Sequence, residues 1–173
     1  MNGKSLGSKS VVRNSHLQWT VKYEPGAIET RGSKNGRVVL TDRRETTGAP
    51  AKLVLRPSLT KIAADGEDAS AIAVEVQDAK GRLMPTAMNK VKFKLSGPGK
   101  IIGVGNGDPS CHEADKPDFP DSATRSAFNG LGMAFVQSTE QAGSIQLEAS
   151  ADDLQPAKIE VQCHVAKLRP SVE

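Results

Sequence analysis

The densest group of chemically reactive side chains lies between residues 108 and 121. It comprises one imidazole and five carboxylates: Asp108, His112, Glu113, Asp115, Asp118 and Asp121. Carboxylate oxygens are the ligands that calcium prefers, but their spacing here is not that of the D-x-D-x-D-G calcium loop. A histidine beside carboxylates also suits acid–base catalysis, although a mobile loop holds such a pair in place poorly. The pattern favours a solvated acidic loop, and we assign no metal ligand and no catalytic residue.

A glycine-rich run, G-V-G-N-G-D, precedes this loop from Gly103 to Asp108. It is similar to the G-x-G-x-x-G of nucleotide-binding turns, but Asp108 stands at the place of the last glycine. Pro109 and the acidic stretch then follow where a helix is needed, because the phosphate is bound by the N–H groups of a helix N-terminus. The run therefore predicts a structural glycine corner, and we assign no cofactor.

Two aromatic side chains, Trp19 and Tyr23, lie on the same face of a strand that alternation predicts from His16 to Tyr23. Such a pair is able to stack on a sugar ring. Aromatic residues make up only 3% of the chain, however, so a small sandwich needs each of them inside. We therefore expect both rings in the core.

The composition excludes several classes of function. The 173 residues carry a net charge of +3, with the basic residues spread along predicted strands, so neither a basic stripe nor an aromatic platform for nucleic acid is present. No run approaches the ~18 apolar residues of a membrane span. The N-terminus lacks the apolar segment of a signal peptide, so we expect a cytoplasmic protein or a chain that begins inside a longer one. Cys111 and Cys163 are expected to be free thiols, with Cys163 packed inward.

The stretch from Lys90 to Pro109 organises the predicted fold. Val91, Phe93 and Leu95 alternate with lysines, which predicts a strand with one buried and one charged face. The glycines that follow favour sharp bends, so we expect this strand to end in a tightly folded corner.

Residues 1–48 read as a partial immunoglobulin-like β unit. Asn2-Gly3 is a hairpin-turn signal whose preceding strand is missing, so the chain looks cut from a larger one. After the strand at 16–23, further strands are predicted at 27–31 and 37–43. The segment E-T-T-G-A-P at 45–50 has no periodicity and is predicted to be a linker.

Residues 49–166 are predicted to form an immunoglobulin-like antiparallel β-sandwich. Roughly seven short strands fall between residues 52 and 165, with turn signals about every ten residues and no helical periodicity. Ile72, Val74 and Val76 are expected to face inward, residues 110–126 are expected to be a long loop, and residues 167–173 a frayed polar tail. The predicted fold class is all-β throughout.

Four motifs together resemble the C-terminal accessory domains of bacterial glycoside hydrolase family 2 β-galactosidases. They are N-G-K-S-L-G at 2–7, W-T-V-K-Y-E-P-G at 19–26, D-G-E-D at 65–68, and G-P-G-K-I-I-G-V-G-N-G-D-P at 97–109. The first two are similar to the immunoglobulin-like domain that follows the catalytic barrel. The segment 50–165 is similar to the next sandwich and to the bacterial immunoglobulin-like domains of adhesins.

The resemblance implies a parent enzyme that cleaves β-galactosides with two glutamates on a (β/α)₈ barrel, in a bacterial periplasm or secreted. Such a barrel needs about 250 residues, so this chain is expected to be a non-catalytic piece that braces it. The expected partners are the catalytic and neighbouring domains, with carbohydrate as a further candidate, and the expected contact loop carries Asn106, Asp108 and His112. The alternative is a free-standing adhesin-like or carbohydrate-binding module.

Overall fold

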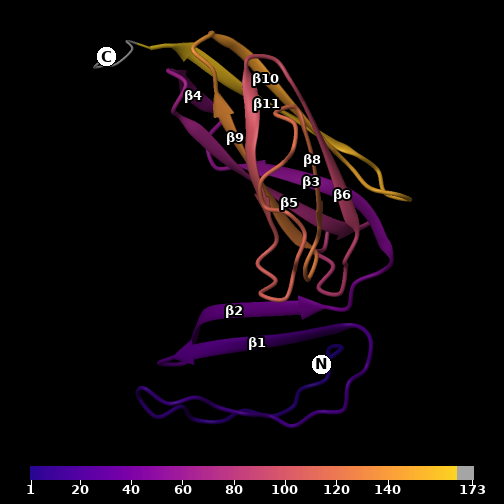
Figure 1. The fold of residues 1–173 in the computed structure, drawn as a ribbon. Helices are drawn as coiled ribbons and strands as arrows, with labels where there is room; N and C mark the ends of the chain where they lie inside the picture. Colours follow the sequence, from indigo (N-terminus) through magenta and orange to yellow (C-terminus); the bar gives the residue numbers. More distant parts are fainter. Residues whose placement is uncertain (167–173) are drawn as a thin grey trace. The chain divides into compact units, whose positions relative to one another are not determined.

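The computed structural model describes residues 1–166, and every regular element in that range is a β-strand (Figure 1). The all-β prediction is confirmed. The chain divides into two compact units between Thr47 and Gly48. No helix long and apolar enough to cross a bilayer occurs in the described range. The tail predicted at 167–173 lies outside the described residues.

The first unit contains one hairpin, β1 (Ala27–Lys34) and β2 (Arg37–Glu45). Asn35 and Gly36 both take positive φ, 53° and 76°, which is the backbone of the two-residue turn that fits the twist of a hairpin. All nine residues of β2 are exposed. The hairpin is thus a two-stranded sheet with no buried face in the described structure.

The strand predicted from His16 to Tyr23 is wrong: these residues form no regular element. The ring of Trp19 is half-buried beneath the ammonium of Lys9, 4.8 Å from its centroid, and Tyr23 is 72% exposed, so neither lies in a core. The alternation marks a face suited to burial, but the described unit offers no second layer to cover that face.

Asn2 and Gly3 make the predicted turn, with φ of 50° and 79° and a hydrogen bond from Lys4 N to Met1 O at 2.9 Å. Asn2 is held against the start of β1. Its backbone N–H donates to Ala27 O, and its Oδ1 accepts from Ala27 N, both at 2.7 Å. The turn therefore docks on the hairpin of its own unit.

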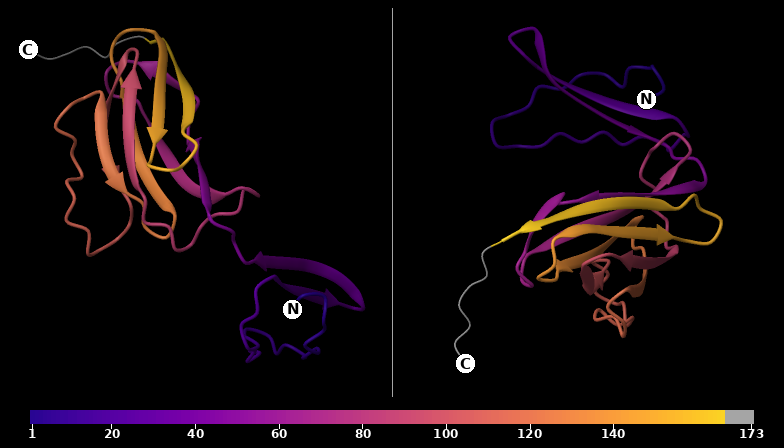
Figure 2. Two further views of the ribbon diagram at one scale, coloured as in Figure 1. Left: turned by 90° about the vertical axis from the view of Figure 1, so that its right-hand side faces the viewer. Right: turned by 90° about the horizontal axis from the view of Figure 1, so that it is seen from above.

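The second unit is a sandwich of nine strands between Pro50 and Val165, in place of the roughly seven predicted (Figures 1 and 2). One sheet has the order β4-β11-β10-β6-β8 and the other β3-β5-β9-β7. All neighbours are antiparallel except β4 and β11. The strands are β3 (Pro50–Pro57), β4 (Lys61–Ala64), β5 (Ala69–Asp78), β6 (Lys90–Ser96), β7 (Gly99–Gly105), β8 (Ser122–Ser126), β9 (Leu131–Ser138), β10 (Gly143–Ser150) and β11 (Ala157–Val165).

The core lies between the two sheets and is built mainly from branched aliphatic side chains. The predicted facing of β6 is confirmed, since Val91, Phe93 and Leu95 are at most 5% exposed and the intervening lysines are exposed. The predicted inward facing of Ile72, Val74 and Val76 in β5 is confirmed as well. Cys163 is buried as expected, and both cysteines are free thiols.

The predicted glycine corner is correct only at Gly97, which takes a positive φ of 96° directly after β6. Gly99–Gly105, expected to belong to the corner, is instead the strand β7. Its register on β9 shifts between Ile101 and Gly103. This bulge lets both Ile101 and Val104 point inward and leaves Ile102 outside, 42% exposed. The glycine at 99 serves close packing, because a Cβ there would collide with the side chain of Ile145.

Besides β7, two further strands were not predicted. β8 occupies the end of the stretch expected to be a loop, and β4 follows the turn after β3. Each has only five or four residues, too few to display a clear alternation. Both are edge strands of the five-stranded sheet.

A candidate binding groove and contact loop

The segment between β7 and β8, residues 106–121, connects the edge strand of one sheet to the edge strand of the other. It covers the outer edge of β7: Ile101 N donates to Pro120 O at 2.6 Å and Val104 N donates to Asp115 O at 2.8 Å. Satisfying the backbone groups of an edge strand removes a site for pairing with another chain. This segment, called the connecting loop below, is therefore attached to the sandwich along its length.

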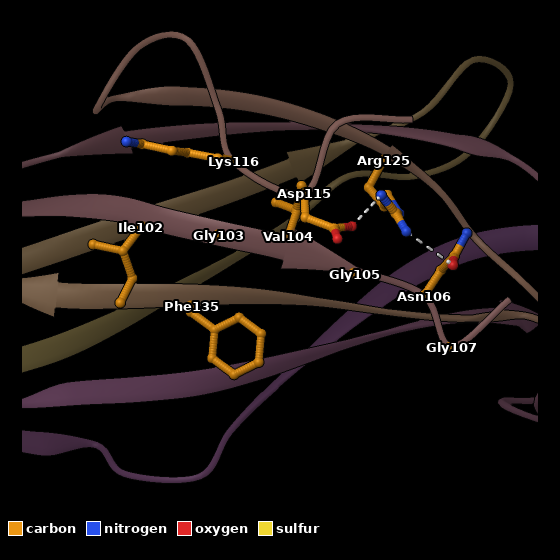
Figure 3. A pocket seen from close by; sticks show the side chains of 10 residues that line it. All are labelled: Ile102, Gly103, Val104, Gly105, Asn106, Gly107, Asp115, Lys116, Arg125 and Phe135. Atoms are coloured by element: carbon orange, nitrogen blue, oxygen red, sulfur yellow. Dashed lines mark hydrogen bonds and ion pairs between the residues drawn. The ribbon is translucent and has the colours of Figure 1, made fainter. Parts of the chain in front are cut away.

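Arg125 of β8 binds the connecting loop through Asp115 and Asn106 (Figure 3). Its side chain is 6% exposed, and Nη1 donates to Glu113 O and to Asp115 Oδ1, both at 2.8 Å. Nη2 donates to Asn106 Oδ1 at 3.3 Å, whereas Nε has no hydrogen-bond partner within the described residues. The planar, forked guanidinium is suited to joining several acceptors at once. One buried cation thus joins the start of the loop to its middle.

A second clamp joins Glu113 to Ser126. Both the backbone N–H and the hydroxyl of Ser126 donate to the Glu113 carboxylate at 2.7 Å. These two hydrogen bonds, aided by the positive charges of Lys90 and Arg125, hold the pKa of Glu113 below its ordinary value. The carboxylate is therefore ionised at neutral pH and committed to the loop's own structure.

The three predicted contact residues differ in how they are bound to the rest of the loop. Asn106 is structural: its amide donates to Ser126 O at 2.9 Å and its Oδ1 accepts from Asp108 N at 3.0 Å. Asp108 accepts two hydrogen bonds from Ser110, which, with the charges of Arg125 and His112, lower its pKa. His112 is exposed on the surface. The structure therefore places Asn106 inside the loop's network and His112 outside it.

The acidic residues of the loop do not gather into one site. Within residues 1–166, no three His, Cys, Asp or Glu side chains lie close enough together to hold a metal ion. Asp118 and Asp121 are exposed, whereas Glu113 and Asp115 are bound to Ser126 and Arg125. Arg125 was not predicted as a site residue, because it lies in the stretch that was interpreted as an unpatterned loop.

A shallow, open groove of about 500 Å³ runs between the connecting loop and the outer face of β7 and β9 (Figure 3). Phe135 is 39% exposed in it, and Ile102 is 42% exposed. The cross-strand neighbours of Phe135 are Gly103 and Ala71. The rim is polar and carries Asn106, Asp115 and Lys116. The groove thus combines an aromatic surface with charged and amide groups.

Comparison with known proteins identifies relatives for both units. Residues 53–160 match the profile of the glycoside hydrolase family 2 C-terminal domain 5, and residues 1–40 match a domain of unknown function (DUF4982). A β-galactosidase of Bacteroides ovatus is 36% identical over 93% of this chain, which spans 18% of that enzyme's length. The chain thus spans less than a fifth of this curated relative.

Solved structures agree with the sequence comparisons. A glycoside hydrolase family 2 member from Bacteroides cellulosilyticus matches 94% of this chain with a TM-score of 0.85 and 30% identity, over 22% of its own chain. A β-glycosidase from Bacteroides vulgatus matches 93% of this chain with a TM-score of 0.83 and 31% identity, over 20% of its own chain. The chain belongs to the glycoside hydrolase family 2 C-terminal domain 5 family.

Proposed function

We propose that this chain is a non-catalytic accessory part of a family 2 glycosidase, of the β-galactosidase type, that braces the part carrying the active site. One observation carries the proposal: the match to the Bacteroides ovatus β-galactosidase covers 93% of this chain but 18% of that enzyme. A (β/α)₈ barrel needs about 250 residues. The matched region is therefore too short to include such a barrel.

The state of the loop carboxylates supports a structural role. Glycosidic hydrolysis by two carboxyl groups needs one group that stays protonated to act as an acid. In the connecting loop, hydrogen bonds lower the pKa of Glu113 and of Asp108, which favours the ionised form of each. Asp115 is paired with Arg125. These groups stabilise the loop.

We assign the contact with the rest of the enzyme to the outer side of the connecting loop, at Asp108 and His112, with Asn106 holding that side in place. The loop is tied to both sheets, so ordering it costs little on association. Phe119, on the same loop, is 65% exposed and supplies an apolar anchor. A fixed loop with an exposed aromatic side chain suits a contact between domains.

Two measurements test the proposal. The isolated chain, incubated with a chromogenic β-galactoside, should give only the background rate; turnover that a single Asp or Glu substitution abolishes would contradict it. In the Bacteroides ovatus β-galactosidase, deletion of the matched region should lower the Tm of the remaining enzyme. A truncated enzyme that keeps its Tm would show that the region does not act as a brace.

A further inference from the structure

We propose that the groove beside Phe135 binds one pyranose ring of a glycan. This inference goes beyond the bracing role and does not depend on it, because the groove lies on the sheet side of the connecting loop. Its parts come from four separated segments: β7, the connecting loop, β8 and β9.

The first element of the site is an accessible aromatic ring. Phe135 projects from the outer face of β9, and the residues opposite it are Gly103 on β7 and Ala71 on β5. Neither neighbour has a side chain large enough to cover the ring, which is 39% exposed. The C–H groups on one face of a pyranose are apolar and slightly positive, so they pack on the negative face of an aromatic ring.

The second element is a carboxylate held at the rim. Asp115 Oδ1 accepts from the buried guanidinium of Arg125 at 2.8 Å, while the Asp115 side chain is 81% exposed. A carboxylate has about four lone-pair sites, so this group is able to accept further hydrogen bonds from sugar hydroxyls. Hydrogen bonds to an ionised acceptor are roughly twice as strong as those between neutral groups.

The third element is open backbone. A Cβ added at Gly105 or Gly107 would meet no atom within 4 Å. The absence of side chains there lets a pyranose ring approach the backbone of the strand and of the start of the loop. Polar atoms of the backbone then become available to the ring hydroxyls.

The chemistry of the groove favours a sugar over a protein segment. The central parts of protein interfaces are depleted in charged residues, whereas this groove is lined by Lys116, Arg125 and Asp115 as well as by Phe135. The charge of Arg125 is offset by the carboxylates of Asp115 and Glu113 beside it. With Lys116 included, the positive and negative groups balance, so a neutral sugar and a uronic acid should bind about equally.

The test is an NMR titration of the full chain with methyl β-galactoside and, separately, with methyl β-glucuronide. Amide signals of Gly103, Gly105 and Gly107 should shift with both sugars. For so open a groove we expect a dissociation constant on the order of 1 mM. The two sugars should bind with similar affinity, because the positive and negative groups beside the groove balance, and added salt should change neither affinity much.

Matched variants locate the site. Phe135→Ala should raise the dissociation constants of both sugars about tenfold or more. Asp115→Asn should also weaken the binding of both sugars, and it changes no residue of the core. Phe119→Ala, which removes an exposed phenylalanine outside the groove, should bind like the unmodified chain. Groove signals that do not shift with either sugar, or equal effects of the two phenylalanine variants, would overturn the proposal.

A different result is expected if another domain of the enzyme covers the groove. In that case Phe135→Ala should lower the Tm of a longer enzyme that contains this chain, and no sugar should shift the amide signals of the groove. That outcome would contradict the sugar site. Failure of the bracing role is detected separately, by the Tm of the truncated Bacteroides ovatus enzyme, which no sugar-binding result affects.

Discussion

The carboxylate of Asp78 accepts a hydrogen bond from the backbone N–H of Gly48, 30 residues earlier, at 2.9 Å. Gly48 is the first residue of the second unit, and Asp78 is the last residue of β5. The same carboxylate accepts from Arg82 Nε at 2.8 Å and from the backbone N–H of Lys80 and Arg82 at 2.9 Å. Although it is charged, Asp78 is only 1% exposed. This carboxylate fastens the point where the sandwich begins to the end of a central strand.

The Asp78 contact predicts a particular pH dependence. The hydrogen bond from Gly48 and then that from Arg82 place the pKa of Asp78 well below its ordinary value. Below about pH 4 the unfolded chain takes up this proton and the folded chain does not, so stability is lost as the pH falls further. Thermal unfolding of the second unit should therefore show a Tm that is steady near neutral pH and declines below about pH 4.

Asp78→Asn is the matched variant, because it keeps the shape and removes the charge. It should lower the Tm at pH 7 by roughly 5–15 °C, and the further fall in Tm below about pH 4 should be smaller than in the unmodified chain. A variant that follows the pH profile of the unmodified chain would show that other carboxylates cause the decline.

Phe93 should be the most sensitive position of β6. It is 2% exposed and lies opposite Ala149 of β10 and Ala123 of β8, so small neighbours surround it. Phe93→Ala should cost about 3–5 kcal/mol of unfolding free energy, because these neighbours are unable to fill the cavity. Lys94→Ala, on the exposed face, should change it by less than about 0.5 kcal/mol. Urea unfolding of the two variants side by side is the measurement, and equal midpoints would contradict the assigned facing.

The first unit should exchange its amide hydrogens faster than the second. The hairpin β1–β2 has no buried face, and Val38, Val39 and Leu40 are 57–67% exposed. A two-stranded hairpin is marginally stable in water. Hydrogen exchange should show protection in β6 and β10 that is orders of magnitude above that in β1 and β2. Equal protection in the two units would mean that an interaction outside the described contacts completes the hairpin.

Arg125→Lys should release the connecting loop while preserving the charge. A lysine ammonium lacks the planar fork that reaches Glu113 O, Asp115 and Asn106 together. An endopeptidase specific for glutamate should then cleave after Glu113 faster than in the unmodified chain, whereas cleavage after the exposed Glu160 of β11 should not change. Unchanged cleavage after Glu113 would show that the backbone contacts with β7 suffice to hold the loop.

The sequence predicts those elements in which local pattern and tertiary burial agree. The alternation in β6 and β5 is long enough to identify both the strand and its buried face. At residues 16–23 the same pattern fails, because alternation reports a face suited to burial and not whether a second layer exists to cover it. The glycines of β7 were interpreted as a bend, but close packing against Ile145 accounts for Gly99 without one.

Neither the groove nor the Arg125 network could be predicted from the sequence. Arg125 is buried because β8 pairs it with Val91 across the sheet, and that pairing joins residues 34 positions apart. Phe135 is accessible because Gly103 and Ala71 stand beside it, on two other strands. No local spacing encodes either relationship. The predicted contact residues Asn106, Asp108 and His112 come from one short stretch of the chain, and their role stays a prediction.

The bracing role is tested most directly by a replacement in the Bacteroides ovatus β-galactosidase. The region that matches this chain is deleted in one enzyme and exchanged for residues 1–173 in another, and the Tm is measured together with turnover of a chromogenic β-galactoside. We expect the deletion to lower the Tm and the exchange to restore most of it, with less restoration when Asp108 and His112 are both changed to alanine. A deleted enzyme with unaltered Tm and turnover would contradict the bracing role.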